Sequence, residues 1–246
     1  MLVVFTLVLA RVLGLFLGAP VFSQREIPRR YRILLAGGIA VGVLPGISPD
    51  ALPADGAAVA WAMVGEVAVG FSIGLLARLT IAGFQLAGQL IGFQAGFAVA
   101  QAFDPDSGAQ SPLLSALYVN LVTVLFLLLD GHHLLIRALA ASYDGFPLGS
   151  HLDAGLLARA LIASSGTMFE IGARVAAPVT GVLLLANASI GFLNRLMPQL
   201  GIFNIGFPMT VAAGLGSVLI GLPGVAHFFQ ISYAQLEGHL ALLVAG

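Results

Sequence analysis

Apolar residues along the chain fall into six segments, which are separated by short polar or Pro/Gly-rich pieces. The segments cover residues 1–24, 33–47, 57–102, 113–142, 154–197 and 201–246. A helix needs about 20 residues to cross the ~30 Å hydrocarbon layer of a membrane, so several segments are too long for one straight span. Places to bend or turn inside the later segments are Gly172, Pro178, Pro198, Gly214, Gly216, Pro223 and Gly224. The pattern predicts an all-α membrane protein of kinked helical hairpins, forming one domain over residues 1–246.

Composition supports the membrane class and removes several kinds of chemistry. Apolar residues make up 59% of the chain, charged residues only 9%, and the mean hydropathy is +1.03, whereas soluble domains carry roughly 25% charged residues. The net charge of −1 and the scattered basic side chains argue against nucleic-acid binding. The sequence has no Cys, which excludes disulfides and thiolate metal sites, and no Lys, which excludes a P-loop.

The charge distribution near the amino terminus predicts an orientation. Four Arg residues against Glu26 lie in residues 25–32, and the excess of basic side chains in a short loop predicts that this loop is cytoplasmic. The amino terminus and the next loop, with Asp50 and Asp55, would then lie outside. The first apolar stretch begins at Leu2 without a basic n-region, so we expect a retained helix rather than a cleaved signal peptide.

Glycines spaced four apart in segment 57–102 predict close helix packing. Gly88, Gly92 and Gly96 form one row, and Gly70 and Gly74 form a second pair. Residues four apart share a helix face, and glycine there lets a neighbouring backbone approach closely. By helical geometry Gln85 and Gln89 lie beside the glycine row, and Gln94 and Gln101 lie on the far side. The row has two open interpretations, which are packing inside the chain and packing against partner subunits in an assembly.

Residues 103–112 interrupt two apolar segments with two carboxylates and two prolines, so they must form a loop. The polar and Pro positions that mark it are Asp104, Pro105, Asp106, Gln110 and Pro112, and Phe103 comes directly before them. From the residues alone, this piece is a solvated hairpin turn.

Charged side chains inside apolar segments are candidates for function because a central ionisable group costs at least ~2.5–3.5 kcal/mol on insertion scales. Glu170 and Arg174 stand four apart and are expected to pair on one helix face. Glu66 has no local partner, so it would pair across helices, snorkel or be protonated.

No catalytic or metal-binding constellation is predicted. His132 and His133 follow Asp130, but adjacent helical residues point about 100° apart and are not expected to chelate one ion from the same face. We expect this piece to be a helix boundary at the membrane interface instead. Ser164 and Ser165 are not part of a Gly-x-Ser-x-Gly motif. We therefore expect a non-enzymatic protein without cofactor or metal.

Three groups of residues together resemble the FliR family of flagellar export-gate proteins, which includes the SctT proteins of injectisomes. The first group is Asn194, Arg195, Pro198, Gln199, Phe203 and Pro208. The second is the stretch from Arg11 to Arg32, with Gly18-Ala19-Pro20-Val21-Phe22 and Ile27-Pro28-Arg29-Arg30. The third is Gly96-Phe97, Asp104-Pro105, Pro112 and Asp130-Gly131-His132.

The resemblance implies a subunit of the type III export gate in the bacterial inner membrane, at the flagellar basal body. Its implied partners are FliP-like and FliQ-like subunits, FlhB-like and FlhA-like components, the lipid bilayer and unfolded secreted polypeptides. The family's loop at residues 103–112 projects into the channel and plugs it, which implies this role for Phe97, Phe103, Asp104, Pro105, Asp106, Gln110 and Pro112. It also implies that partner subunits hold much of the protein above the membrane plane.

A second hypothesis is a self-contained, ion-coupled secondary transporter that uses Glu66, Glu170 or Asp130 near broken helices. Inverted repeats would favour it, but the sequence has no convincing internal repeat. Neighbouring genes for export-apparatus partners would instead favour the export gate.

Overall fold

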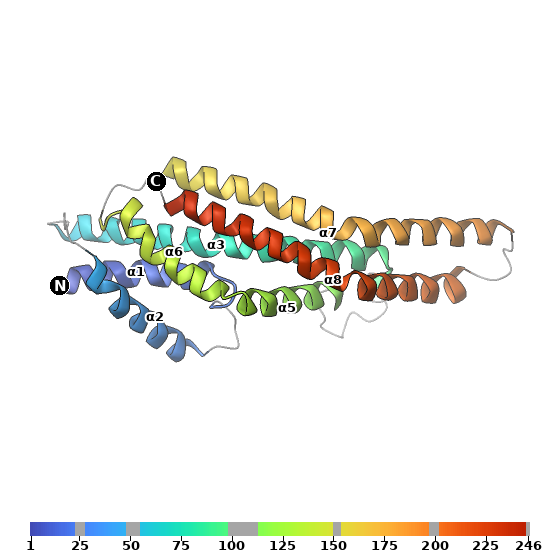
Figure 1. Cartoon of the computed structure of the whole chain (residues 1–246), viewed down its shortest axis with the longest axis horizontal. Helices are drawn as coiled ribbons and strands as arrows, with labels where there is room; N and C mark the ends of the chain where they lie inside the picture. Colours follow the sequence, from blue (N-terminus) through green and yellow to red (C-terminus); the bar gives the residue numbers. More distant parts are fainter. Residues whose placement is uncertain (23–27, 48–54, 98–112, 150–153, 197–201, 245–246) are drawn as a thin grey trace. The chain divides into compact units, whose positions relative to one another are not determined.

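The computed structural model is built from α-helices and one short 3-10 helix in the residues that it describes (Figure 1). It describes residues 1–22, 28–47, 55–97, 113–149, 154–196 and 202–244, but not the side chains of residues 154, 156, 202–205 and 207. The helices are α1 (Leu2–Gly18), α2 (Arg29–Val43), η1 (Leu44–Gly46), α3 (Gly56–Gln94), α5 (Leu113–Leu128), α6 (Gly131–Gly145), α7 (Ala154–Leu196) and α8 (Ile202–Val244). The predicted all-α class is confirmed.

The chain forms two compact units that are not consecutive in sequence. Unit 1 comprises Met1–Thr80, Phe126–Gly166 and Tyr233–Gly246, and unit 2 comprises Ile81–Leu125 and Thr167–Ser232. The chain passes between the units inside α3, α5, α7 and α8 rather than through linkers. The two units are therefore not domains that a cut in the sequence would separate.

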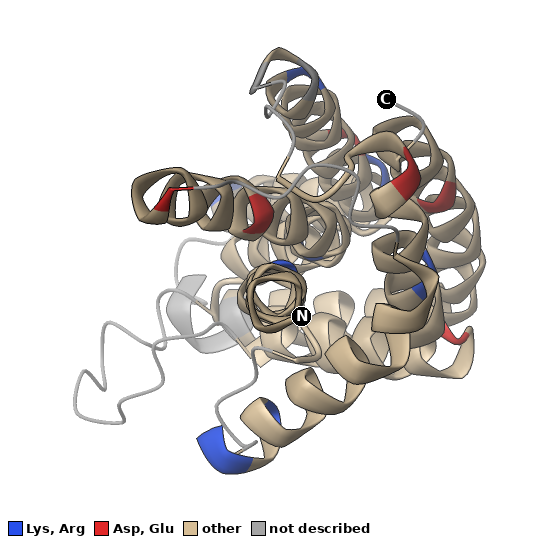
Figure 2. Cartoon of the chain, turned by 90° about the vertical axis from the view of Figure 1, so that its left-hand side faces the viewer, with Lys and Arg blue, Asp and Glu red and all other residues tan. Residues whose placement is uncertain are grey.

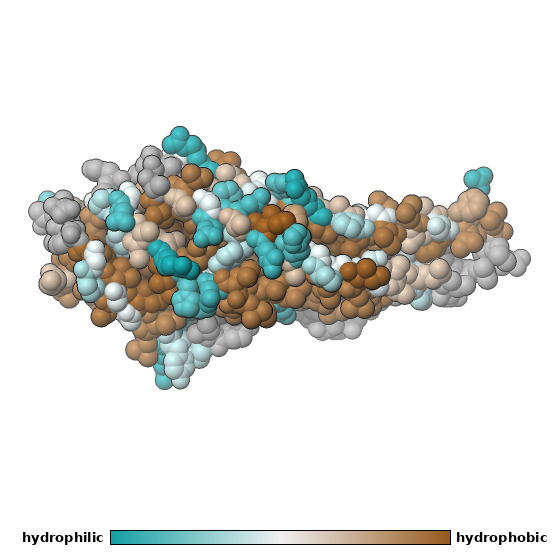
Figure 3. All heavy atoms as spheres, viewed as in Figure 1, coloured by the Kyte–Doolittle hydropathy of each residue, from teal (hydrophilic) through white to brown (hydrophobic). Residues whose placement is uncertain are grey.

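Within the described residues, three helices are long and apolar enough to cross a membrane, namely α3, residues 157–196 of α7 and residues 208–244 of α8, and the bent pair of α5 and α6 could form a fourth span. Charged positions are sparse on the ribbon, and apolar side chains cover much of the face of the molecule in view (Figures 2 and 3). The helices α7 and α8 each have 43 residues, which corresponds to roughly 65 Å of helix at 1.5 Å per residue. Both therefore exceed the ~30 Å hydrocarbon layer, as the segment lengths predict.

The later predicted bend positions include prolines that lie inside helices. Pro178 lies inside α7, and Pro208 and Pro223 lie inside α8. Segment 113–142, which hydropathy presents as continuous, is divided by Asp130 into α5 and α6, whose axes differ by 64°.

In unit 1, α1 and α3 cross at very short backbone separation. A Cβ atom on Gly70 would overlap the carbonyl oxygen of Arg11, and one on Gly74 would lie 2.5 Å from the nitrogen of Ala19. Gly14 and Gly18 of α1 are equally constrained by the backbone of α3. The predicted Gly70–Gly74 face is therefore a real contact surface, and a second small-xxx-small pair in α1 packs against it.

Candidate functional site: a buried charged cluster

The buried ionic centre of unit 1 joins Arg11 of α1 to Glu66 of α3. Arg11 Nε donates to Glu66 Oε2 at 2.5 Å, and only 1% of the Arg11 side chain and 4% of the Glu66 side chain are exposed. The two residues are 55 positions apart in sequence. A buried charge pair is stable only when its remaining hydrogen-bonding atoms also find partners.

Both Nη atoms of the guanidinium also donate a hydrogen bond, one to α6 and one to the residue that follows it. Arg11 Nη1 donates to Ser142 Oγ at 2.9 Å, and Nη2 donates to the carbonyl oxygen of Phe146 at 2.8 Å. The Arg11 Cζ atom lies 3.9 Å from the centroid of the Tyr143 ring, a cation–π geometry. Since Arg has five N–H donors and no acceptor, this ring of acceptors matches its chemistry.

The second carboxylate oxygen of Glu66 fixes a turn after α6. The backbone N–H of Gly149 donates to Glu66 Oε1 at 3.1 Å, and φ of Gly149 is 75°. An L-residue with a Cβ rarely adopts this conformation, so Gly is the favoured residue there. One carboxylate therefore connects α3 both to α1 and to the end of α6.

The glycine faces position this cluster. Glu66, Gly70 and Gly74 are four residues apart and share one face of α3. On α1, Arg11 lies one turn before Gly14 and two turns before Gly18, so the charges stand at one end of the close crossing. The backbone separation that glycine permits lets the Arg11 guanidinium reach Glu66.

The arrangement is suited to holding helices together rather than to binding a substrate or ion. Both charges are almost completely buried, and the Arg11 guanidinium and both Glu66 carboxylate oxygens have partners within the protein. No solvent-exposed atom of the pair is left for chemistry. We therefore regard the cluster as the polar lock of unit 1.

One residue of this pair is predicted from the sequence. Glu66 is singled out as a buried charge needing a partner, and pairing across helices, one of three open alternatives, is the one that occurs. Arg11 is missed as a site residue because it is used only as part of a family-like stretch. The signal that could identify Arg11 is its place as a single Arg in an otherwise apolar segment. Because inserting an unpaired charge into a membrane is costly, such an Arg needs a carboxylate partner.

The predicted Glu170–Arg174 pair is confirmed in unit 2. Arg174 Nη2 lies 2.7 Å from Glu170 Oε1, but the two side chains are 64% and 49% exposed. The pair therefore differs from the Arg11–Glu66 pair in burial although both join one Arg to one Glu.

The glycine row of α3 is shorter than its spacing predicts. Gly88 and Gly92 are buried, and a Cβ atom on Gly88 would lie 2.7 Å from the Cα of Ser115 in α5. Gly96 does not extend the row, because α3 ends at Gln94 and Gly96 has φ of 84°, a conformation that terminates helices. At Gly88 the row thus contacts the same chain.

The neighbouring amides lie differently from the glycines. Gln85 and Gln89 are exposed, so these two side chains, rather than Gly88 and Gly92, are accessible to another molecule. Whether they bind one stays a prediction.

Only part of the remaining predicted set lies in the described residues. Phe97 is partly exposed, Asn194 is partly exposed and Arg195 is exposed in the last turn of α7. Pro208 is exposed inside α8, and Phe203 belongs to the first turns of α8 with its side chain outside the described part. The other predicted residues lie outside the described ranges, and they are Phe103, Asp104, Pro105, Asp106, Gln110, Pro112, Pro198 and Gln199.

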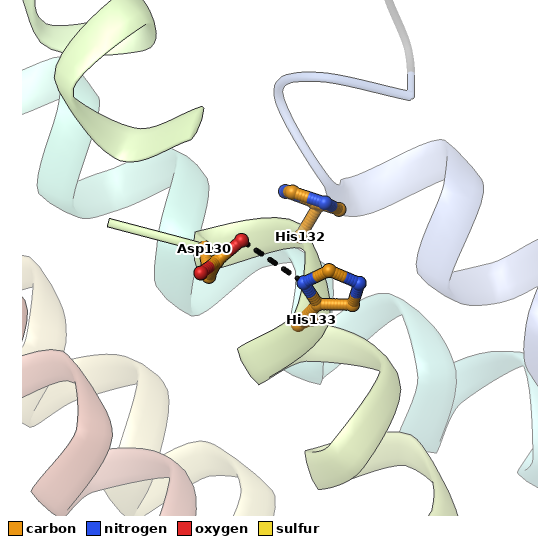
Figure 4. A group of neighbouring side chains, drawn as sticks. All are labelled: Asp130, His132 and His133. Atoms are coloured by element: carbon orange, nitrogen blue, oxygen red, sulfur yellow. Dashed lines mark hydrogen bonds and ion pairs between the residues drawn. The ribbon is translucent and has the colours of Figure 1, made fainter. Parts of the chain in front are cut away.

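The rings of His132 and His133 lie closer together than the expected 100° separation on the helix predicts. Their ring centroids are 4.1 Å apart, and potential ligand atoms of Asp130, His132 and His133 all lie within 4.8 Å of one another (Figure 4). The 100° separation describes where side chains leave a helix, whereas rotation about the side-chain bonds turns both imidazoles toward Asp130 at the start of α6.

Apolar composition, membrane-length helices and a buried structural ion pair define an all-α integral membrane protein. The chain belongs to the bacterial export proteins, family 1, whose pattern matches residues 2–236.

Relatives over most of the chain are flagellar biosynthetic proteins FliR. The Escherichia coli K12 protein is 31% identical over 96% of this chain and 91% of its own length. The Pectobacterium carotovorum protein is 33% identical over 94% and 88%, and the Bacillus subtilis 168 protein is 31% identical over 97% and 95%. The chain is thus a membrane protein of flagellum biogenesis and export.

Proposed function

We propose that this chain is a non-enzymatic subunit of the flagellar type III protein export gate in the bacterial inner membrane. It completes a channel with FliP-like and FliQ-like subunits, and FlhB-like and FlhA-like components act beside it. The observation that carries the proposal is the match to flagellar FliR proteins over more than nine-tenths of the chain.

The long, little-buried helices support a role in an assembly. In the most apolar stretch of α7 only 17% of the residues are buried, and in that of α8 22%, against 44% for α3. Large apolar side chains stand exposed along α7, including Ile162, Phe169, Leu185 and Phe192. A helix of roughly 65 Å has about twice the length that ~30 Å of hydrocarbon covers. Partner subunits would cover the apolar surface that lipid does not reach.

The plug function is assigned to the loop at residues 103–112. Its carboxylates and prolines stand between two strongly apolar segments, a composition that favours an aqueous channel over lipid. In this proposal the loop helps to keep the pore closed until unfolded substrates are secreted.

Assembly is tested by co-expressing the full chain with FliP-like and FliQ-like proteins from the same source and weighing the detergent-extracted complex by native mass spectrometry. We expect one stable hetero-oligomer that contains a single copy of this chain. Purification of the chain alone as a monomer or homodimer, with both partners present in the same membranes, would contradict the proposal.

Deleting residues 104–110 is expected to leave the assembled complex intact and to raise its conductance for ions in reconstituted bilayers, because the deletion removes the proposed plug. A matched deletion in residues 48–54, another polar piece between apolar segments, should leave conductance at the wild-type level. Background conductance in the 104–110 variant, with complex mass unchanged, would remove the plug assignment while leaving the gate assignment standing.

The transporter hypothesis receives no specific support from the described residues. Glu66, the carboxylate that it needs most, is occupied by Arg11 and by the N–H of Gly149. A coupling carboxylate must instead release and take up its ion during each cycle.

A further inference from the structure

We propose that Asp130, His132 and His133 form a binding site for a divalent transition-metal ion of the Zn²⁺ type at the break between α5 and α6. The site does not depend on the export-gate function. It lies within unit 1, and its three residues supply one carboxylate and two imidazoles (Figure 4).

The Asp130 side chain has an unusual role for its position. Asp130 is the N-cap residue of α6, but its side chain makes no capping hydrogen bond to the helix, although Asp at this position commonly accepts one from a backbone N–H. Its Oδ1 atom instead lies 3.1 Å from Nδ1 of His133. The carboxylate is therefore turned toward the imidazoles rather than toward the backbone.

His132 belongs to this group of three residues and has a nitrogen without a hydrogen-bond partner. Its Nδ1 atom is buried and has no hydrogen-bond partner among the described residues. A buried polar atom without a partner is costly, and a metal ion would satisfy it because neutral imidazole offers a lone pair. The ring lies against that of His133, with 4.1 Å between the centroids and an angle of 37° between the ring planes.

The distances are close to those of a coordinated ion. Ligand atoms 2.0–2.2 Å from Zn²⁺ in tetrahedral geometry are roughly 3.3 Å apart, and the three groups now lie within 4.8 Å of one another. The side chains of His133 and Asp130 are 60% and 66% exposed, so small rotations can close this difference. Two imidazoles favour Zn²⁺, Ni²⁺ or Cu²⁺ over Mg²⁺ and Ca²⁺.

Aromatic side chains of α5 and α8 hold the backbone at the break between α5 and α6. A Cβ atom on Gly131 would overlap the Phe126 ring, and that ring lies edge-on to Tyr233 with 6.2 Å between centroids. The Tyr233 hydroxyl donates to the carbonyl oxygen of Leu129 at 2.9 Å. These contacts fix the turn, so ion binding orders only side chains and would brace the 64° break.

The test uses the full chain, purified in detergent with an affinity tag that contains no histidine and stripped with a chelator. Zn²⁺ is then titrated by calorimetry and the bound metal is counted by elemental mass spectrometry after dialysis. We expect one Zn²⁺ per chain. Each of D130N, H132Q and H133Q should weaken binding by roughly tenfold or more, since even outer-shell partners are worth about 10–100-fold.

The matched control is His227→Gln, which removes a histidine from unit 2 and should leave affinity unchanged. Asn tolerates the left-handed conformation of Asp130, whose φ is 56°, so D130N keeps the backbone. Wild-type affinity in any one of the three variants, or equal loss in the control, overturns the site. Co²⁺ bound to the unaltered chain provides a second readout, because a spectrum identical to that of the aqueous ion would also overturn it.

Discussion

We expect Arg11→Met to lower the free energy of unfolding by about 3–5 kcal/mol, because it leaves the Glu66 carboxylate buried without its charge partner. Both side chains are almost fully buried in the native protein, so water cannot replace the guanidinium. Equilibrium unfolding of the detergent-solubilised chain, followed by the loss of helical circular dichroism, measures the change.

Two further variants separate the buried charge from mere loss of a side chain. Arg11→Met combined with Glu66→Leu removes both charges and is expected to recover most of the loss, since apolar replacement of a buried pair is often neutral. Arg174→Met breaks the Arg–Glu pair of unit 2 and should cost less than Arg11→Met, because the protein does not enclose Glu170 as it encloses Glu66. Equal losses in Arg11→Met and Arg174→Met would contradict the assignment of Arg11–Glu66 as the polar lock.

Gly70→Ala is expected to lower the free energy of unfolding, and the loss should reach or exceed the about 1–3 kcal/mol that is typical of overpacking. The added methyl group would overlap the Arg11 carbonyl oxygen, and this atom belongs to the backbone of α1, which cannot rotate away as a side chain can. Thermal unfolding of the purified chain and its recovery as a single species on size-exclusion chromatography are the measurements.

The same helix offers a control with the opposite expected sign. Nothing lies within 4 Å of a Cβ atom built on Gly65, so Gly65→Ala should leave stability unchanged or raise it by up to about 1 kcal/mol through better helix propensity. If Gly70→Ala behaves like Gly65→Ala, the close crossing of α1 and α3 is not part of the native fold.

The fold class and much of the packing followed from sequence, but partner choice did not. Spacing four apart predicts that Gly70 and Gly74 face a nearby backbone, whereas nothing in that pattern says that the backbone belongs to α1. The insertion cost of a buried charge likewise predicts that Glu66 needs a partner without identifying Arg11. Periodicity describes one helix at a time, and contacts between residues 55 positions apart are outside its reach.

Local backbone conformation was the other limit. The break at Asp130 is invisible to hydropathy because one carboxylate and one glycine hardly alter the mean of an apolar run. The left-handed φ of Asp130 and the positive φ of Gly96 are decided by tertiary packing. For the same reason, the rotation that brings His132 beside His133 does not follow from helical spacing.

The interleaving of the two units constrains how the protein is made. Unit 1 draws its parts from both ends of the chain, and its last contribution is Tyr233–Gly246 at the end of α8. Buried leucines of that piece, Leu236, Leu240 and Leu243, reach the core only after α8 has left the ribosome. The amino-terminal helices must therefore wait, inserted but incompletely packed, while about 150 further residues are synthesised. Unit 1 is therefore completed only once α8 has been synthesised, and shielding of those early helices until then is a requirement that the topology itself creates.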